Sequence, residues 1–431
     1  MKYYPLPSEL FRFNRQRFME QIPTGSLAIF HSNDLMPRSG DTFFPFRQNN
    51  DLYYLSGIEQ EETVLLLFPG CTKSGFEEVL FIRKPNERLL RYEGEQLTPT
   101  KARRFSGIEK VLWLDEYEAI LRELILLSER VYLNLDEHDR FHSPVLTRNQ
   151  RMAQQLNAQY PAHQYQRSGP LVKRLRMVKS PAEVDAIQQA VNITGQAFTE
   201  VLKMLEPGVQ EYEVEATITA SFLQQRATGH AYDPIIASGA NTCVLHYTNN
   251  NKPCREGELL LMDFGAEYAF YAADITRTIP VSGRFSERQR AVYDAVLKVQ
   301  RESIKMLLPG TDLDEYHREV GRLMEAELLA LGLIDSTDVK NQDPKQPAYK
   351  KYFMHGTSHH LGLDVHDPGL RYEPVQAGNV FTCEPAIYIP EEKIGIRLEN
   401  NILVTEKGPI DLSARVPIEA SEIEAWMNGA S

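Results

Sequence analysis

The sequence is poor in cysteine and contains no long apolar run. Its 431 residues include only four cysteines, which are Cys71, Cys243, Cys254 and Cys383. No two of them form a C-x-x-C pair, so the sequence favours neither a zinc cage nor a disulfide framework and is typical of a reducing compartment. The apolar run 64–68 is typical of the longest, whereas a membrane-spanning helix needs about 20 apolar residues. The first 20 residues alternate charged and apolar side chains, which does not indicate a signal peptide.

Basic residues are also the minority among the charged ones, at 47 against 59 acidic residues, for a formal charge of −12. A negative surface repels phosphates, so binding to DNA or RNA by electrostatic attraction is not expected. Hydrophobic residues make up 42% of the chain, which is enough for a large core. We therefore expect a cytoplasmic protein of two or three domains, with neither a nucleic-acid nor a membrane partner.

The N-terminal part of the chain has the pattern of a smaller mixed α/β domain. Short β-rich runs occur at 26–31, 63–68, 79–82 and 131–134, and the clearest helical pattern among them covers 115–130. A strong helix start follows at Ser180-Pro181-Ala182-Glu183, which is a capping box with proline at the first helical position. The boundary is predicted shortly before this helix, giving domains over 1–172 and 173–431.

The second predicted domain contains a pattern that occurs twice. Helix pairs are predicted over 181–205 and 211–226, and again over 286–308 and 313–331, with Pro-Gly between the helices of each pair. A β-rich stretch follows each pair, over 234–281 and over 353–412. This order predicts a pseudo-twofold α+β domain with a site between its halves. The alternative is coincidence, because Pro-Gly is common at helix ends.

Two aspartates stand at the ends of apolar strand patterns in the first half. Asp263 ends the run 259–263, and Asp274 follows 11 residues later in another β-like run. A hairpin joining the two runs would bring both carboxylates to one surface. The alternative is that Asp263 caps a turn and Asp274 is a solvated strand residue.

Four histidines cluster in the second half. His355, His359, His360 and His366 fall within 12 residues. Histidine is the commonest metal ligand and a frequent general acid or base. Because adjacent residues on a strand point to opposite faces, either His359 or His360 is expected to face away from a shared site.

Two glutamates lie in otherwise apolar strand patterns. Glu384 follows a strand and precedes a proline, and Glu399 follows Arg397 by two residues. Burying a carboxylate is costly unless it is paired or bound to a metal. For Glu399 the alternative to metal binding is an ion pair with Arg397 on the same strand face.

These candidates sum to four carboxylates and one imidazole. Four negative charges at one site would repel one another, whereas two divalent cations would neutralise them. An oxygen-rich set without thiolate favours Mn²⁺, or Fe²⁺ or Co²⁺, over structural zinc. Two neighbouring cations generate a bridging hydroxide, so the residues alone predict a dinuclear metallohydrolase.

The stretches that carry these residues resemble a known family. Four stretches are similar to the ligand motifs of the pita-bread metallopeptidases, and most of all to those of the Xaa-Pro aminopeptidase (aminopeptidase P) family. They are MDFGAEYAFYAADITRT, HGTSHHLGLDVHD, FTCEPAIYI and GIRLEN. The run FRQNNDLYYLSG at 46–57 resembles that family's N-terminal domain, so the likeness covers nearly the whole chain. The resemblance implies a pita-bread catalytic domain after the smaller N-terminal one. It also implies five metal ligands, which are Asp263, Asp274, His359, Glu384 and Glu399, with Asp274 and Glu399 bridging two ions.

The resemblance further implies roles around the metals. His246 would bind substrate, His355 and His366 would line the pocket and stabilise the intermediate, and Arg397 would stand beside the last ligand. A metal-bridging hydroxide would attack the carbonyl before proline, and Glu384 would pass the proton towards the proline nitrogen. The implied substrates are peptides with proline at position two, and the implied assembly is a dimer or tetramer.

Two other functions remain open. Prolidase shares the fold and ligands but cleaves only dipeptides. The 15-residue spacing of Glu384 and Glu399 favours the aminopeptidase, because prolidases tend to have a longer insertion there. A metal-free pita-bread module that binds proteins is the second alternative, and the five intact ligand positions argue against it.

Overall fold

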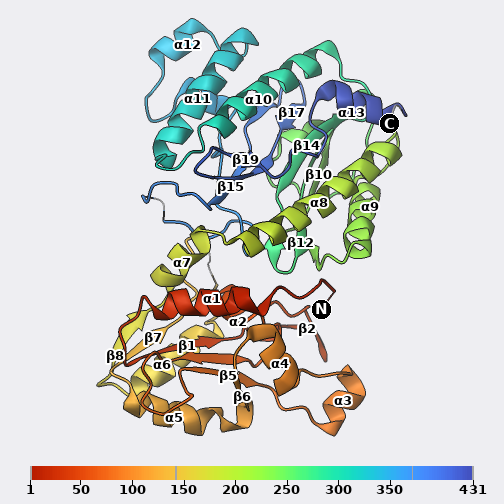
Figure 1. The fold of residues 1–431 in the computed structure, drawn as a ribbon. Helices are drawn as coiled ribbons and strands as arrows, with labels where there is room; N and C mark the ends of the chain where they lie inside the picture. The colour runs from red at the N-terminus through yellow and green to blue at the C-terminus, as the bar shows by residue number, and fades with distance from the viewer. Residues whose placement is uncertain (1, 141–142, 371, 430–431) are drawn as a thin grey trace. The chain divides into compact units, whose positions relative to one another are not determined.

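The computed structural model describes residues 2–140, 143–370 and 372–429. The chain divides into two compact units, one over Tyr3–Arg176 and the other from Met177 onward. In Figure 1 the first unit runs from red to yellow and the second continues to blue. Helix α7 (Gly169–Met177) ends at the division.

The first unit is built on a six-stranded mixed sheet in the order β6-β5-β4-β1-β7-β8. The strands of this unit are β1 (Ser26–His31), β2 (Pro37–Ser39), β3 (Thr42–Phe43), β4 (Val64–Leu67), β5 (Glu78–Ile82), β6 (Lys110–Trp113), β7 (Arg130–Leu133) and β8 (Gln164–Arg167). Its helices, besides α7, are α1 (Ser8–Met19), α2 (Asn50–Ser56), α3 (Glu87–Glu93), α4 (Pro99–Ser106), α5 (Tyr117–Leu127) and α6 (Arg148–Gln159). Strands β2 and β3 form a separate hairpin.

Both faces of this sheet are buried. Leu27 and Ile29 of β1 belong to a core that includes residues of α5 and α6. Side chains alternate along a strand, so Phe30 points the other way, where its ring lies 5.4 Å from that of Phe18 on α1. Burial on both sides explains why β4 and the middle of β1, residues 27–30, are continuously apolar rather than alternating.

The predicted strands of this unit are confirmed to within about one residue at each end. The helix predicted over 115–130 is wrong at its C-terminus, because α5 ends at Leu127 and Arg130 begins β7. Ser128 adopts an extended conformation and its hydroxyl donates to the carbonyl of Ile125 at 2.9 Å, which ends the helix.

The second unit repeats a helix pair followed by strands, as predicted. Its helices are α8 (Pro181–Met204), α9 (Glu211–Gln224), α10 (Glu287–Lys305), α11 (Leu313–Ala330), α12 (Ser336–Asn341) and α13 (Ala420–Met427). Its strands are β9 (Gly229–His230), β10 (Ile235–Ser238), β11 (Leu259–Phe264), β12 (Ala266–Tyr268), β13 (Tyr271–Ala272), β14 (Ile275–Pro280), β15 (Val380–Cys383), β16 (Ala386–Ile389), β17 (Ile394–Arg397), β18 (Asn400–Leu403) and β19 (Ile410–Asp411). Short 3₁₀ turns complete the chain at Leu114–Glu116, Gly239–Cys243 and Ala348–Lys351.

Sheets β10-β11-β14 and β15-β18-β19 form the centres of the two halves of this unit. The long helix α8 begins as predicted, because the Glu183 carboxylate accepts a hydrogen bond from the Ser180 backbone N at 2.8 Å. Helix α10 has the equivalent start, where the Ser286 hydroxyl accepts from the Gln289 backbone N at 3.2 Å. These caps satisfy N–H groups that the first turn of a helix leaves unpaired.

The strand expected at the start of the second β-rich stretch is wrong. Within the described part of 353–379 the chain is irregular, and its one ladder contact is the isolated bridge between His360 and Phe381. Glycines at 356, 362 and 369 and a proline at 368 interrupt this segment. The loop is tightly packed, since a Cβ at Gly369 would lie 2.2 Å from the His360 ring. The histidine cluster therefore lies on a loop rather than on a strand.

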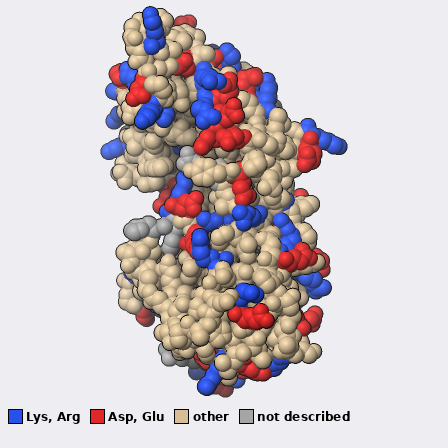
Figure 2. Space-filling model, turned by 90° about the vertical axis from the view of Figure 1, so that its left-hand side faces the viewer, with Lys and Arg blue, Asp and Glu red and all other residues tan. Residues whose placement is uncertain are grey.

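Acidic and basic side chains are interspersed on the face drawn in Figure 2, without a broad field of one sign. Among the helices of the described residues, none combines the length and the apolar character that crossing a membrane requires.

Candidate metal centre

Two antiparallel strands bring Asp263 and Asp274 together. β11 pairs with β14 so that Asp263 lies opposite Thr276, and Asp274 directly precedes β14. The predicted hairpin is thus confirmed, with the short strands β12 and β13 inserted in it. The hydroxyl oxygen of Tyr232 lies 2.6 Å from Oδ1 of Asp263 and 2.6 Å from Oδ1 of Asp274. Both carboxylates therefore face one point.

The second half of the unit contributes two glutamates to the same region. Glu384 directly follows β15, and Glu399 lies between β17 and β18. The Thr276 hydroxyl donates to Glu399 Oε2 at 2.7 Å, and the Glu399 backbone N donates to the Thr276 carbonyl at 3.1 Å. These bonds join the strand after Asp274 to the segment that carries Glu399, so both predicted halves contribute to the site.

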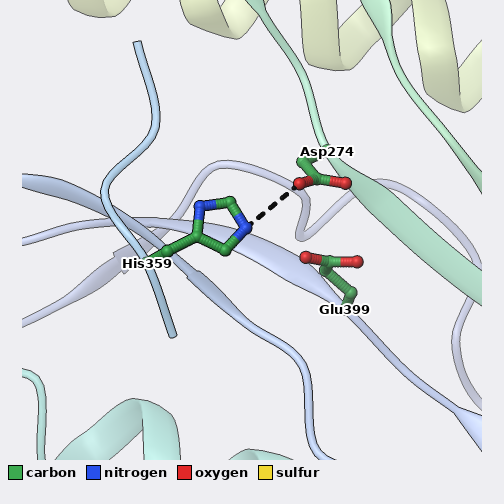
Figure 3. Close-up of side chains that lie close together, drawn as sticks. All are labelled: Asp274, His359 and Glu399. Atoms are coloured by element: carbon green, nitrogen blue, oxygen red, sulfur yellow. Dashed lines mark ion pairs between the residues drawn. The ribbon is translucent and has the colours of Figure 1, made fainter. Parts of the chain in front are cut away.

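His359 completes the cluster. Its Nε2 lies 3.4 Å from Oδ2 of Asp274 and 3.7 Å from Oε1 of Glu384. One ligand atom each from Asp274, His359 and Glu399 lie within 4.8 Å of one another, and Figure 3 shows the three side chains converging. The ring turns its Nδ1 to the carbonyl of His360 at 2.9 Å. A carbonyl only accepts, so Nδ1 carries a proton, and in the neutral ring Nε2 would then be the atom that offers its lone pair to a metal.

The buried carboxylates of the cluster need positive charge nearby to be stable in their ionised form. Burial raises the pKa of Glu384 to about 7. Burial, and then the charges of Asp274 and Glu384, raise the pKa of Glu399 well above its usual range. Glu399 is only 2% exposed, and a buried ionised carboxylate is stable only beside a cation or several donors. The donor set of carboxylate oxygens and one imidazole nitrogen fits divalent cations.

Arg397 lies beside the cluster, but its partner differs from the one considered from the sequence. Its Nη2 lies 2.6 Å from Oδ2 of Asp263, and its Nη1 donates to the Tyr388 hydroxyl at 2.8 Å. Among the described residues, the close ion pair of Arg397 is with Asp263 rather than with Glu399, although the charge of Arg397 also acts on Glu399. β17 ends at Arg397, so the two-residue spacing to Glu399 does not keep the side chains on one strand face. Glu399 is left available for a metal.

The other predicted histidines lie around this centre. His366 stacks edge-on against His359, with ring centroids 4.2 Å apart. His355 Nδ1 lies 3.7 Å from Glu384 Oε2 and 2.8 Å from the Gly356 carbonyl, while Nε2 lies 3.0 Å from the Tyr388 hydroxyl. Burial lowers the pKa of His355 to about 4, and Arg397 and His246 contribute to the shift. His246 is exposed.

Sequence reasoning missed several residues that the structure brings to the centre. Tyr232 contacts two predicted ligands, and Tyr388 links His355 to Arg397. The side chain of Asn401 pairs with both the backbone N and the carbonyl of Asp274. No local pattern marks these positions, because their partners are far away in sequence.

The sequence also matches known protein families. Residues 185–406 match the model of metallopeptidase family M24, and residues 11–132 match that of the aminopeptidase P N-terminal domain. The first match covers more than half of the chain.

The chain belongs to metallopeptidase family M24.

The similarity to M24 relatives covers both units of the chain. The chain is 36% identical to Xaa-Pro aminopeptidase of Escherichia coli over 97% of its length and 98% of the relative. It is 33% identical to Xaa-Pro aminopeptidase of Haemophilus influenzae, over 98% of each chain. The solved structure of aminopeptidase P from Escherichia coli superposes with a TM-score of 0.89 at 32% identity, covering 99% of each chain. A zinc-substituted form of that enzyme with product gives a TM-score of 0.88 at 33% identity, over 99% of this chain and 100% of that one.

These M24 matches confirm the predicted fold class, a mixed α/β N-terminal domain followed by a pita-bread domain. They also confirm a metal-dependent aminopeptidase and favour it over prolidase. Divalent metal ions follow from the family.

A buried ion pair supports the loop that carries His366. Lys179 Nζ lies 2.9 Å from Oδ2 of Asp367, and both side chains are 1% exposed. Removing one partner of a buried pair leaves an uncompensated charge. We expect Asp367→Asn to lower the free energy of unfolding by about 3–5 kcal/mol in urea denaturation.

The matched control is Asp294→Asn, whose partner Arg290 lies at a similar 2.9 Å but with the pair 40% and 52% exposed. For Asp294→Asn we expect the free energy of unfolding to fall by about 0–1 kcal/mol. Equal losses in Asp367→Asn and Asp294→Asn would contradict a role for the burial of the Lys179 pair.

Proposed function

We propose that this M24 metallopeptidase is a Xaa-Pro aminopeptidase, which releases the first residue from peptides with proline in second position. The observation that carries the proposal is the convergence of Asp274, His359 and Glu399 on one point, with Glu384 3.7 Å from His359. The names of the bacterial relatives support the substrate class.

We assign five side chains that would hold two divalent cations, with Mn²⁺ as the metal. The five ligands are Asp263, Asp274, His359, Glu384 and Glu399. Two divalent cations supply Lewis acidity and lower the pKa of a coordinated water. The tautomer of His359 and the mutual repulsion of the acids support this assignment.

We assign the proton transfer to Glu384. Its carboxylate oxygens lie 3.7 Å from His355 Nδ1 and 3.7 Å from His359 Nε2, so a group that can accept a proton and then donate it stands within the cluster. The acceptor is the proline nitrogen, which becomes the amine of the leaving product. As the nitrogen of a tertiary amide it carries no hydrogen, so a peptidase that relies on that N–H gains nothing here.

The surrounding residues bind and orient the peptide. We assign His246 to substrate binding and His355 and His366 to the pocket wall. The lowered pKa of His355 keeps it neutral, with Nδ1 carrying the proton towards the Gly356 carbonyl. Arg397 orients Asp263 through the 2.6 Å ion pair.

Substrate length distinguishes the aminopeptidase from prolidase. A strict dipeptidase is best served by a cation fixed on the free carboxylate of proline, whereas Arg397 is already paired with Asp263. We expect Xaa-Pro-Xaa tripeptides and longer chains to be cleaved with a higher kcat/KM than the matching dipeptide, since contacts beyond proline add binding energy.

The measurement is kcat/KM in Mn²⁺ buffer for a dipeptide, a tripeptide and a pentapeptide that share their first two residues. A tripeptide without proline at position two is the control and should be a poor substrate. Cleavage confined to the dipeptide would mean prolidase. Absence of bound metal in the purified protein, with no cleavage at all, would favour the protein-binding module.

We further propose that the enzyme is a cytoplasmic homo-oligomer, a dimer or a tetramer. We propose residues 1–172 and 173–431 as its two domains.

A further inference from the structure

Glu211, a residue outside the metal centre, has an unusually complete set of hydrogen bonds. It opens helix α9 and is fully buried. Oε1 accepts from the backbone N and the hydroxyl of Ser238, at 2.8 and 2.7 Å. Oε2 accepts from the Tyr247 hydroxyl at 2.8 Å and from the Lys252 backbone N at 2.9 Å. All of these donors come from the two ends or the middle of one segment, residues 238–252.

That segment carries His246, which is exposed and lies where the chain is irregular. The next residue, Tyr247, is buried against Glu211. Asn250 is also buried, and its Oδ1 accepts from the Ile236 backbone N at 3.0 Å. The Asn250 side chain donates to Glu215, one helical turn after Glu211, at 2.8 Å. Two carboxylates of helix α9, Glu211 and Glu215, therefore bind the chain just after His246.

The chain before His246 is held from another side. The Thr242 hydroxyl accepts a hydrogen bond from the Gly395 backbone N at 2.9 Å. Gly395 has to be glycine for this approach, since a Cβ there would lie 2.1 Å from the Thr242 carbonyl oxygen. Gly395 belongs to β17, two residues before Arg397. His246 thus lies between an attachment to the strand of Arg397 and an attachment to α9.

We propose that Glu211 is a positioning residue for substrate binding, which fixes His246 through the hydroxyl of Tyr247. The inference rests on the proposed function, in which His246 contacts the peptide. An exposed side chain on an irregular segment would otherwise sample many positions, and ordering it on binding would weaken affinity. Glu211 is fully buried, and both of its carboxylate oxygens are bonded to the segment 238–252.

The first test is Tyr247→Phe, which removes one hydroxyl and keeps the buried ring. With metal-loaded enzyme and one Xaa-Pro-Xaa tripeptide, we expect KM to rise roughly tenfold and kcat to change by less than about twofold. Glu211→Gln should raise KM further, because the amide N–H₂ would replace a carboxylate oxygen that accepts hydrogen bonds and would face other donors. Tyr293→Phe is the matched control, because it removes another buried hydroxyl bond, 2.7 Å to the Ile418 carbonyl, and should leave KM unchanged.

The second test asks whether the effect passes through His246. In a His246→Ala background, Tyr247→Phe should change KM by less than about twofold, because coupled residues are not additive. Backbone hydrogen exchange over 244–250 should speed up roughly tenfold in Tyr247→Phe and stay unchanged in Tyr293→Phe, a result that does not depend on catalysis.

The outcomes separate the two ideas. Wild-type enzyme that does not cleave the tripeptide would reject the proposed function and this inference with it. Active wild type with an unchanged KM in Tyr247→Phe, or with a full tenfold effect in the His246→Ala background, would overturn the inference alone. Faster exchange without a change in KM would also overturn it, because the segment would then be held for stability only.

Discussion

Glu384→Gln is expected to reduce kcat by at least about 10²–10⁴-fold, the range of general acid–base catalysis, while the protein keeps most of its metal. The amide preserves the shape of the side chain and one oxygen donor but cannot accept the proton. Steady-state kinetics on a Xaa-Pro-Xaa tripeptide, with metal content measured on the same sample, tests this. Near-normal turnover in a metal-loaded variant would remove Glu384 from the proton transfer.

Two further variants make that result specific. Asp274→Asn is expected to lose metal as well as activity, because a neutral amide is a poorer ligand for a divalent cation than a carboxylate. Glu392→Gln is the matched control, since this glutamate pairs with Arg288 on the surface at 2.8 Å and should leave both metal and turnover unchanged. Metal retained in Asp274→Asn at wild-type level would contradict the assignment of Asp274 as a metal ligand.

Removing the metals is expected to destabilise the second unit, by an amount that grows as the pH rises. Ions that bind only the folded state contribute about 2.7 kcal/mol at a hundredfold excess over the dissociation constant. In the metal-free chain, burial raises the pKa of Glu384 from 4.5 to about 7. A carboxyl group with a raised pKa contributes stability that is fully present below its unfolded value and is lost as the pH rises through the folded one.

The metal-free protein should therefore lose stability between about pH 4.5 and 7, and Glu399 should extend the loss to higher pH. Metal binding strengthens over the same interval, because the ligands have to be deprotonated. Calorimetric melts at pH 5, 6, 7 and 8, with chelator or with Mn²⁺, measure the difference in Tm. Asp274→Asn is the control and should show no difference. A difference in Tm between metal-loaded and metal-free protein that stays constant with pH, or no difference at all, would contradict a centre of buried carboxylates.

Sequence patterns predicted the parts of this protein whose causes are local. Strand 26–31 was predicted at its observed bounds, because a short β-rich run with the apolar centre 27–30 leaves few alternatives. The start of α8 was predicted because the capping box at Ser180 and Glu183 needs only a three-residue spacing. The motif resemblance named five ligands, and the structure brings all five to one region. Asp263 lies near the end of β11, Asp274 and Glu399 directly precede β14 and β18, and Glu384 directly follows β15.

Local patterns failed where a residue's environment depends on distant chain segments. The histidine segment was expected to be a strand, but the packing of its glycines against His360 and Asp367 makes it an irregular loop. Arg397 was considered as a partner of Glu399, whereas the pairing of β16 with β17 and the position of β11 direct it to Asp263.

The sequence by itself determined the chemistry of the site: which carboxylates and which imidazole are available, the family they belong to and the positive charge they need. Only the tertiary structure decided how that chemistry is held. Tyr232 meets two aspartates 31 and 42 residues away, and Glu211 meets Tyr247 36 residues away. Such contacts leave no periodicity or spacing in the sequence, because they arise when whole helices and strands pack and buried polar groups have to find partners.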